Sequence, residues 1–233
     1  MFRTIWCAII ILPATVIMAI LSMILSLFIP KGRGYHFCAR VWAKIILWTA
    51  GVKVKVFGLE NIDPNNDYVF VSNHCSNFDI PVVITSIPNQ IRLVAKKELS
   101  KIPFMGWSLR MGDYILIDRA NRNDSMKSLE DGVSKLQNGR SVLMFAEGTR
   151  SVTGEIREFK KGPFLLAIKA QVPVVPVTIN YTQNIMVKNT LIVKSGTVEI
   201  HIEKPISTKG LNEDDRHRLL DDAFKMVKLN HKL

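Results

Sequence analysis

The chain contains few of the residues that mark a disulfide framework or a structural metal site. Only three of its 233 residues are cysteines, Cys7, Cys38 and Cys75, and their spacing fits neither a zinc site nor a set of paired disulfides. This favours a reducing compartment and predicts that no metal is bound. Internal repeats and low-complexity linkers are also missing. The length then predicts one folded domain with a short appendage.

Acidic residues are scarce relative to basic ones. The chain has 20 Asp and Glu against 31 Lys and Arg, which gives a formal net charge of +11. Such an excess favours an anionic partner, whether nucleic acid, an anionic membrane surface or a phosphorylated metabolite. No nucleic-acid-binding motif is present, so we expect no nucleic-acid partner.

Charge is absent altogether from the 27 residues between Thr4 and Pro30. A helix of that length measures about 40 Å, more than the hydrocarbon core of a bilayer at about 30 Å. The apolar run is long for the core of a secretory signal peptide, and no clear small-residue cleavage site follows it. A membrane segment is therefore favoured over a signal peptide.

The next segment, 35–50, has the pattern of an amphipathic helix. Its apolar residues recur at helical spacing, at Phe37, Val41, Ile45 and Trp48. The basic residues Arg40 and Lys44 lie at other positions of the helix. Two arrangements stay open. The first helix spans the bilayer with its basic side cytoplasmic, or both helices form a hairpin in one leaflet, which Pro13 favours. Residues 1–50 are thus predicted as a membrane-anchoring pair of helices, and 51–233 as a second domain at the cytoplasmic face, on the inner membrane in a bacterium.

From residue 51 onward, strand and helix patterns alternate. Strands are predicted at 52–56, 68–71, 91–95, 114–117 and 141–145, with helices at 79–86, 104–111, 124–137, 164–170 and from about 212. Two prolines in 172–177 predict an extended edge or a rigid wall rather than a central strand, and 191–193 with 197–202 predict a hairpin. The predicted fold class is α/β, with a mixed, mostly parallel sheet flanked by helices.

One candidate site lies where the strand at 68–71 meets the following helix. His74 falls on this turn, and Asp79 follows five residues later, where it is predicted to cap the helix that Pro81 opens. The turn can fold the carboxylate back onto the imidazole. A carboxylate on one ring nitrogen leaves the other nitrogen to act as a base. His–Asp pairs at this spacing also arise by chance. Cys75 is a poor candidate for a nucleophile activated by His74, because the side chains of adjacent residues point apart.

A second candidate site follows the strand at 141–145, at the sheet edge where ligands bind in α/β proteins. Gly148 lets a ligand approach the backbone, Thr149 offers a hydroxyl, and Arg150 offers a fork of donors for a phosphate. The simpler alternative is a surface turn with an ion pair between Glu147 and Arg150.

Taken together, four sequence blocks resemble the lysophosphatidic acid acyltransferase family of glycerolipid acyltransferases. They are Asn73-His74 through Asp79, then 96–99 with 112–119, then 145–151, and finally 172–177. The resemblance covers roughly Val52 to His201 and extends to the N-terminal helices. Ala146 departs from the proline that the family usually has there, a change that removes no functional group.

This resemblance implies transfer of a fatty acyl group from a thioester to the sn-2 hydroxyl of 1-acyl-glycerol-3-phosphate, which yields phosphatidic acid. His74 and Asp79 would be catalytic, with no cofactor beyond the co-substrate, acyl-coenzyme A or acyl carrier protein thioester. The substrate-binding residues would be Lys96, Arg119, Glu147, Gly148, Thr149 and Arg150. The expected partners are lysophosphatidic acid, the acyl donor and membrane lipids.

Three other functions stay open from the sequence. The same blocks would serve acyl transfer to another acceptor, such as lyso-ornithine lipid, a lysophospholipid with a larger head group, or glycerol 3-phosphate. Thioester hydrolysis is a second alternative, although an attacking water molecule has no phosphate and needs no cluster of Lys and Arg side chains to bind it. A basic protein that binds a membrane surface or nucleic acid without turnover is the third.

Overall fold

The computed structural model describes residues 2–29, 32–118, 130–136 and 138–233. Seven strands form one sheet in the order β1-β7-β6-β2-β5-β3-β4. Every neighbouring pair is parallel except β6 and β7, so the predicted α/β class with a mixed, mostly parallel sheet is confirmed. The strands are β1 (Val52–Phe57), β2 (Val69–Ser72), β3 (Ile91–Lys96), β4 (Ile115–Ile117), β5 (Ser141–Phe145), β6 (Val174–Asn180) and β7 (Gly196–Ile202).

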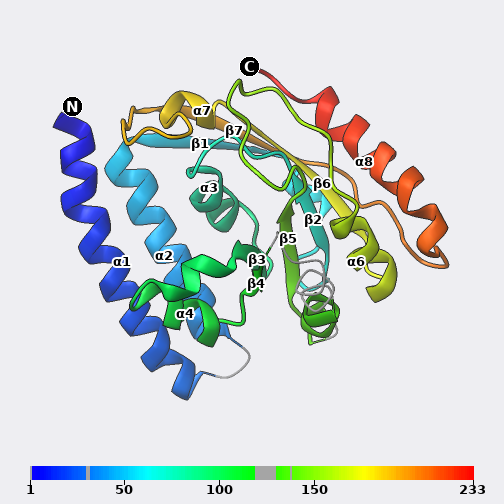
Figure 1. Ribbon diagram of the computed structural model, residues 1–233, viewed down its shortest axis with the longest axis horizontal. Coiled ribbons are helices and arrows are strands. Elements are labelled where there is room, and N and C mark those ends of the chain that lie inside the picture. The colour runs from blue at the N-terminus through cyan, green and yellow to red at the C-terminus, as the bar shows by residue number, and fades with distance from the viewer. Residues whose placement is uncertain (1, 30–31, 119–129, 137) are drawn as a thin grey trace.

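Helices cover both faces of this sheet (Figure 1). They are α1 (Phe2–Phe28), α2 (Arg33–Ala50), α3 (Asp79–Ser86), α4 (Met105–Met111), α6 (Gly162–Ala170), α7 (Thr182–Ile185) and α8 (Arg216–Leu229), with short 3-10 turns η1 (Leu59–Asn61), η2 (Lys97–Lys101) and η3 (Glu213–Asp215). One apolar core joins α2 and α3 to the sheet, and a second joins α6 and α8 to the other face. The predicted helix at 124–137 is helical over 130–136, and the rest of it lies outside the described residues.

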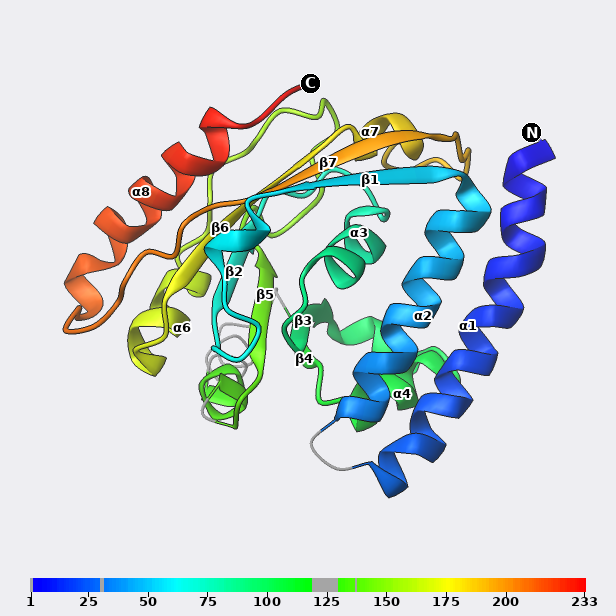
Figure 2. The same cartoon turned by 180° about the vertical axis from the view of Figure 1, so that it is seen from behind.

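The N-terminal helices form an antiparallel pair beside the sheet (Figure 2). Arg40 of α2 donates hydrogen bonds to the carbonyls of Thr85, Ile87 and Pro88, which lie at the C-terminal end of α3. These bonds satisfy carbonyls that a helix end leaves unpaired. They also fix α2 against the helix that follows the His74 turn. The division at residue 50 into anchor and second domain stays a prediction.

The prediction for the proline-rich strand was wrong, because β6 lies inside the sheet between β7 and β2. Pro176 is tolerated there because of a bulge. β6 pairs Val177 with Ile202 at the end of β7, and Val174 with Ile206 in the chain that follows, so the segment that continues β7 has one more residue between the two pairs than β6 has. The amide of Val174 points toward that chain. The position two residues on points the same way, so the missing N–H of Pro176 falls at the bulge.

The predicted hairpin of 191–193 with 197–202 was also wrong. β7 pairs instead with β1 on one side and with β6 on the other, which leaves no open edge for a hairpin partner. The segment 191–193 is irregular, and the amide of Val193 donates to the hydroxyl of Thr4 in α1 at 3.1 Å. The loop before β7 is therefore attached to the N-terminal helix.

Candidate active site

A histidine–carboxylate pair lies at the carboxyl end of β2. His74 Nδ1 is 2.6 Å from Asp79 Oδ2, and Asp79 is fully buried. The same oxygen accepts the backbone amides of Cys75 and Ser76 at 2.8 and 2.9 Å. The sequence prediction that the turn folds Asp79 back onto the ring is confirmed. Asp79 is the first residue of α3 rather than its cap, which is Phe78, since its carboxylate turns toward the preceding loop.

His74 is held by the end of β5 and the loop that follows it. Its ring stacks on Phe145, with ring centroids 3.9 Å apart and planes inclined by 11°. Its backbone amide donates to Glu147 Oε1 at 2.8 Å, and its carbonyl accepts from the amide of Ser151 at 2.7 Å. With Nδ1 bonded to Asp79, Nε2 is the nitrogen left for proton transfer.

Glu147 supports this loop and does not line the adjacent cavity. Its second oxygen accepts the amide of Arg157 at 3.2 Å, and the residue is almost fully buried. Burial raises the pKa of this carboxyl to about 7, while the two amide bonds act in the opposite direction. The alternative of a Glu147–Arg150 ion pair does not fit, because the carboxylate is directed at backbone amides. Gly148 has φ +75°, a conformation that favours glycine, at the tip of the turn.

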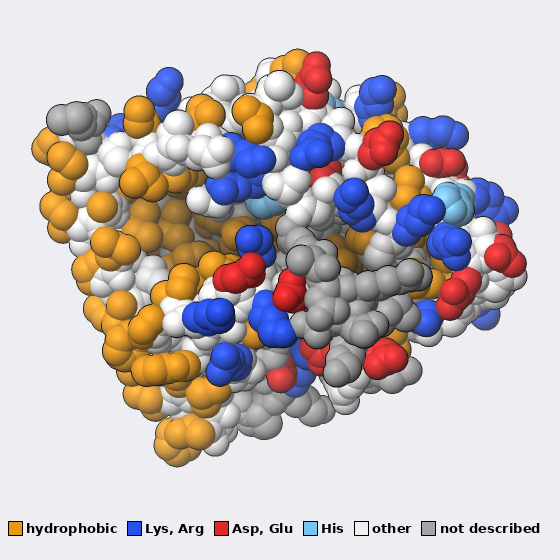
Figure 3. Space-filling view, in the orientation of Figure 1, with side chains coloured by type: hydrophobic (Ala, Val, Ile, Leu, Met, Phe, Trp, Pro, Cys, Tyr) orange, Lys and Arg blue, Asp and Glu red, His pale blue; other side chains and the backbone are white. Residues whose placement is uncertain are grey.

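A cavity of about 510 Å³ joins this pair to an apolar chamber. The polar side chains that line it include His74, Lys96, Thr149 and Arg150. Apolar side chains from α1, α2, α3, β3 and α4 form the rest, among them Met18, Ala39, Trp42, Ile84, Leu93, Met105 and Leu109. Figure 3 shows the hollow, with an apolar floor and with a histidine and several basic side chains at its rim. Such a site suits a molecule with an anionic head and an apolar chain.

The structure therefore brings most of the predicted site residues together. The side chain of Lys96 is 60% exposed, and its ammonium lies 3.7 Å from Glu98 in a surface pair. Lys96 also lines the cavity. Arg119 lies outside the described residues. Cys75 is buried, and burial raises the pKa of its thiol to about 12, so it is protonated and unsuited to act as a nucleophile. The described residues contain no cluster of three or more candidate metal ligands.

Besides Phe145, two residues of the site were not predicted from the sequence. The side chain of Asn73 makes paired hydrogen bonds of 2.8 Å with both backbone groups of Ile179, which fixes the His74 turn to β6. The hydroxyl of Thr182 donates to the other oxygen of Asp79. Asn73 opens the first of the four sequence blocks, but its role in fixing the turn was not predicted. Thr182 is 103 positions from Asp79, and no local pattern marks it.

Comparison with known proteins defines the class first. Residues 53–180 match the family model described as Acyltransferase, and this range contains both the His74 turn and the loop after β5. The crystal structure of the 1-acyl-sn-glycerophosphate acyltransferase PlsC from Thermotoga maritima matches 98% of this chain and 94% of its own, with a TM-score of 0.82 and 27% sequence identity. Fold and site together are those of an α/β acyltransferase.

Relatives of similar sequence identify the family within this class. The 1-acyl-sn-glycerol-3-phosphate acyltransferase of Borreliella burgdorferi is 31% identical over 77% of this chain and 72% of its own length. The Saccharomyces cerevisiae enzyme of that name is 34% identical over 76% of this chain, and the human alpha form is 33% identical over 76%. The chain spans 59% and 62% of the length of those two relatives. It belongs to the 1-acyl-sn-glycerol-3-phosphate acyltransferase family.

Proposed function

We propose that this protein transfers a fatty acyl group from a thioester to the sn-2 hydroxyl of 1-acyl-glycerol-3-phosphate, forming phosphatidic acid. One observation carries the proposal: a carboxylate-bound histidine shares a single cavity with Lys96, Arg150 and an apolar chamber. That cavity offers a base, a site for a phosphate and room for an acyl chain. The names of the relatives support the same reaction.

In this mechanism Nε2 of His74 takes the proton of the acceptor hydroxyl while that oxygen attacks the thioester carbonyl. Asp79 stabilises the imidazolium that forms and keeps Nδ1 protonated. The tetrahedral intermediate then expels the thiolate, which leaves with the proton from His74. The new ester bond replaces the thioester bond, so no enzyme nucleophile is needed, consistent with the protonated thiol of Cys75.

The positively charged side chains of the site position the acceptor. Arg150 and Lys96 would bind its phosphate, with Thr149 as a further donor, because all three line the cavity beside His74. We keep Arg119 in this set as a proposal from the sequence. Glu147 and Gly148 act indirectly, since they shape the loop that carries Thr149 and Arg150 and that holds His74.

The N-terminal helices indicate association with a membrane. α1 is long and apolar enough to cross a bilayer, and most of it is exposed. It also packs along α2 and α4 (Figures 1 and 2), so a perpendicular crossing would draw the charged domain into lipid. We propose that both helices lie in one leaflet at the cytoplasmic face, where the lysolipid substrate is held.

One turnover assay tests this proposal. The full chain is given lysophosphatidic acid, lysophosphatidylcholine, lyso-ornithine lipid or glycerol 3-phosphate, each with acyl-coenzyme A and with acyl carrier protein thioester. We expect phosphatidic acid from lysophosphatidic acid at the highest kcat/KM, with no added metal or cofactor, and the two donors identify the thioester used. Faster turnover of another acceptor would reassign the substrate. Free fatty acid without phosphatidic acid would indicate thioester hydrolysis, and salt-sensitive membrane binding without turnover would exclude an enzyme.

A further inference from the structure

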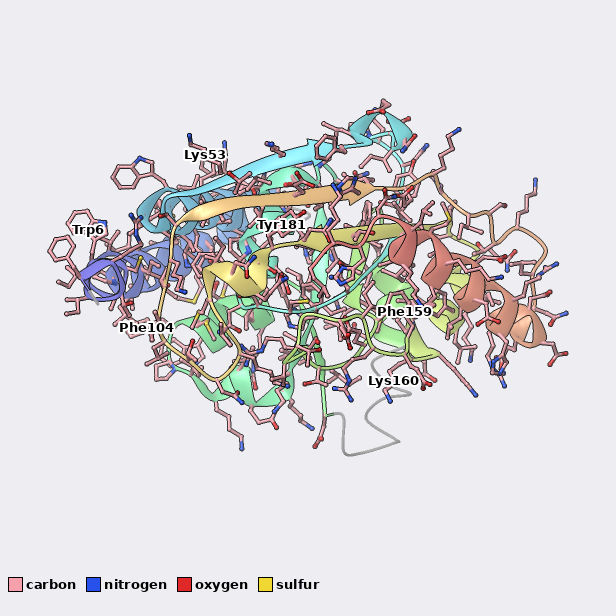
Figure 4. All side chains as sticks on the ribbon, turned by 90° about the horizontal axis from the view of Figure 1, so that it is seen from above. Trp6, Lys53, Phe104, Phe159, Lys160 and Tyr181 are labelled. Atoms are coloured by element: carbon pink, nitrogen blue, oxygen red, sulfur yellow. The ribbon has the colours of Figure 1, made fainter. Side chains whose placement is uncertain are left out.

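Two segments far from α1 in the sequence add exposed apolar side chains to its side of the molecule. The segment 102–111, which contains α4, exposes Ile102, Phe104, Trp107 and Met111. The loop before β7 exposes Leu191 and Ile192, and Leu191 is 78% exposed. Figure 4 places Phe104 and Trp6 of α1 at the same end of the molecule. Exposed apolar groups gathered in this way mark an interaction surface.

Each segment makes a hydrogen bond to α1. The hydroxyls of Ser108 and Ser22 are 2.8 Å apart, and the amide of Val193 donates to Thr4. Thr4 and Ser22 lie about 27 Å apart along the axis of α1, given a rise of 1.5 Å per residue. The two segments therefore bracket α1 near its two ends. A helix so bracketed presents one broad apolar surface rather than a single edge.

The chemistry of segment 102–111 is that of a membrane interface. Lys101 and Arg110 flank the aromatic residues, and no Asp or Glu occurs from 99 to 112. Aromatic rings beside basic side chains suit the level of anionic lipid head groups. Phe104 also has φ +59° and ψ −59°, a strained conformation for a bulky residue, and such strain is retained at functional positions.

We propose that segment 102–111 and residues 191–192 of the loop before β7 insert into the same leaflet as α1. The occupant of this surface is an anionic bilayer. On its inner side, segment 102–111 lines the cavity through Met105 and Leu109, so the lysolipid acceptor would enter from the leaflet past this segment. This last step rests on the proposed function, whereas the membrane contact itself does not.

Fluorophores at three introduced cysteines test the contact. Trp107→Cys and Leu191→Cys carry an environment-sensitive dye, and Leu229→Cys is the matched control. Leu229 is 85% exposed, and its helix α8 lies on the opposite side of the molecule from α1 (Figure 1). The native cysteines are each 2% exposed, and labelled wild type measures their background. With vesicles of phosphatidylcholine and phosphatidylglycerol, we expect a blue shift and quenching by acyl-brominated lipid at 107 and 191 only.

If the chain binds vesicles but the dyes at 107 and 191 show neither the blue shift nor the quenching, the proposal is overturned and the membrane contact is limited to α1. A second variant, Trp107→Gln with Leu191→Gln, should lower turnover of substrate presented in vesicles, with no change for short-chain lysophosphatidic acid in solution. Equal loss in both formats would mean damage to the domain instead. Because the dyes report without turnover, failure of the proposed function would leave this result standing.

A separate observation concerns Thr182, the first residue of α7. It is fully buried, and its hydroxyl donates to Asp79 Oδ1, while Asp79 Oδ2 accepts His74 Nδ1. The preceding residue, Tyr181, has φ +70°, a left-handed conformation that costs a residue with a Cβ. The strained turn at the end of β6 thus places Thr182 behind the carboxylate. Thr182 also lies beyond the residues 53–180 that match the family model.

We infer that Thr182 is a positioning residue. Its hydrogen bond orients the carboxylate of Asp79 and stabilises part of its negative charge. In Thr182→Val, kcat should fall by up to about a hundredfold with KM unchanged for both substrates. The acid limb of the pH–rate profile should move to higher pH, because a carboxylate with fewer donors holds the imidazolium proton more strongly. Thr182→Ser, which keeps the hydroxyl, should restore both.

Thr178→Val is the matched control for this inference. Thr178 is also fully buried, and its hydroxyl donates to the carbonyl of Val227 in α8, away from the site. It should lose stability as Thr182→Val does, with an unchanged pH–rate profile. Identical profiles for the two valine variants and wild type would reduce Thr182 to a structural role and overturn the inference.

Discussion

Replacement of His74 by alanine is expected to lower kcat for acyl transfer by about 10⁴-fold, the upper range for loss of a general base. The remaining site would still bind both substrates, because Lys96, Arg150 and the apolar wall do not depend on the imidazole. The buried Asp79 would keep the amides of Cys75 and Ser76 and the hydroxyl of Thr182 as donors. The protein should therefore stay folded. The measurement is single-turnover formation of phosphatidic acid under saturating conditions.

His217→Ala is a suitable control for this variant, since His217 is exposed on α8. It should match wild type in rate and in vesicle binding. Circular dichroism and vesicle sedimentation show whether His74→Ala is folded and bound. A folded His74→Ala enzyme with the wild-type rate would exclude His74 as the base, and the mechanism above would have to be abandoned.

Replacement of Arg150 by alanine is expected to raise KM for lysophosphatidic acid by about 10- to 100-fold, with little change in KM for the acyl donor. A hydrogen bond to a charged group contributes about 1.5–3 kcal/mol, and each 1.4 kcal/mol is a factor of about ten. The effect should depend on the acceptor's phosphate. With 1-acylglycerol, which lacks it, Arg150→Ala and wild type should have similar kinetics.

Arg218→Ala on α8 controls for the loss of one positive charge, because Arg218 is exposed and pairs with Asp215 at the surface. If this control raised KM as much as Arg150→Ala, the effect would be long-range attraction and would weaken at high salt. Equal losses with lysophosphatidic acid and 1-acylglycerol would instead show that Arg150 does not bind the phosphate.

Much of the site could be read from the sequence because its parts lie close together along the chain. His74 and Asp79 are five residues apart, and a turn between a strand and a helix brings such positions into contact whatever the rest of the fold does. Lys96 is the last residue of β3, Thr149 and Arg150 follow β5, and the ends of parallel strands meet at one sheet edge. The role of Glu147 was not readable, since a carboxylate in a loop gives no sign that it will accept backbone amides.

The errors in the fold came from long-range pairing. Pro176 disfavours a central strand locally, but a bulge opposite it removes the need for its N–H. The segment 191–193 has strand-like residues, but β7 already has partners on both sides. Tertiary context overrides a local preference of this size, because strand propensities differ by only about 1 kcal/mol.

The sequence by itself determined the α/β class, the apolar N-terminal helix and the His74–Asp79 pair, since periodicity and short spacing express local geometry. Only the tertiary structure decided which distant groups complete the site: Phe145 against the ring, Glu147 on its backbone and Thr182 behind Asp79. These contacts join separate strands of the sheet, and strand order depends on how the two cores pack. No local pattern in the chain specifies that packing.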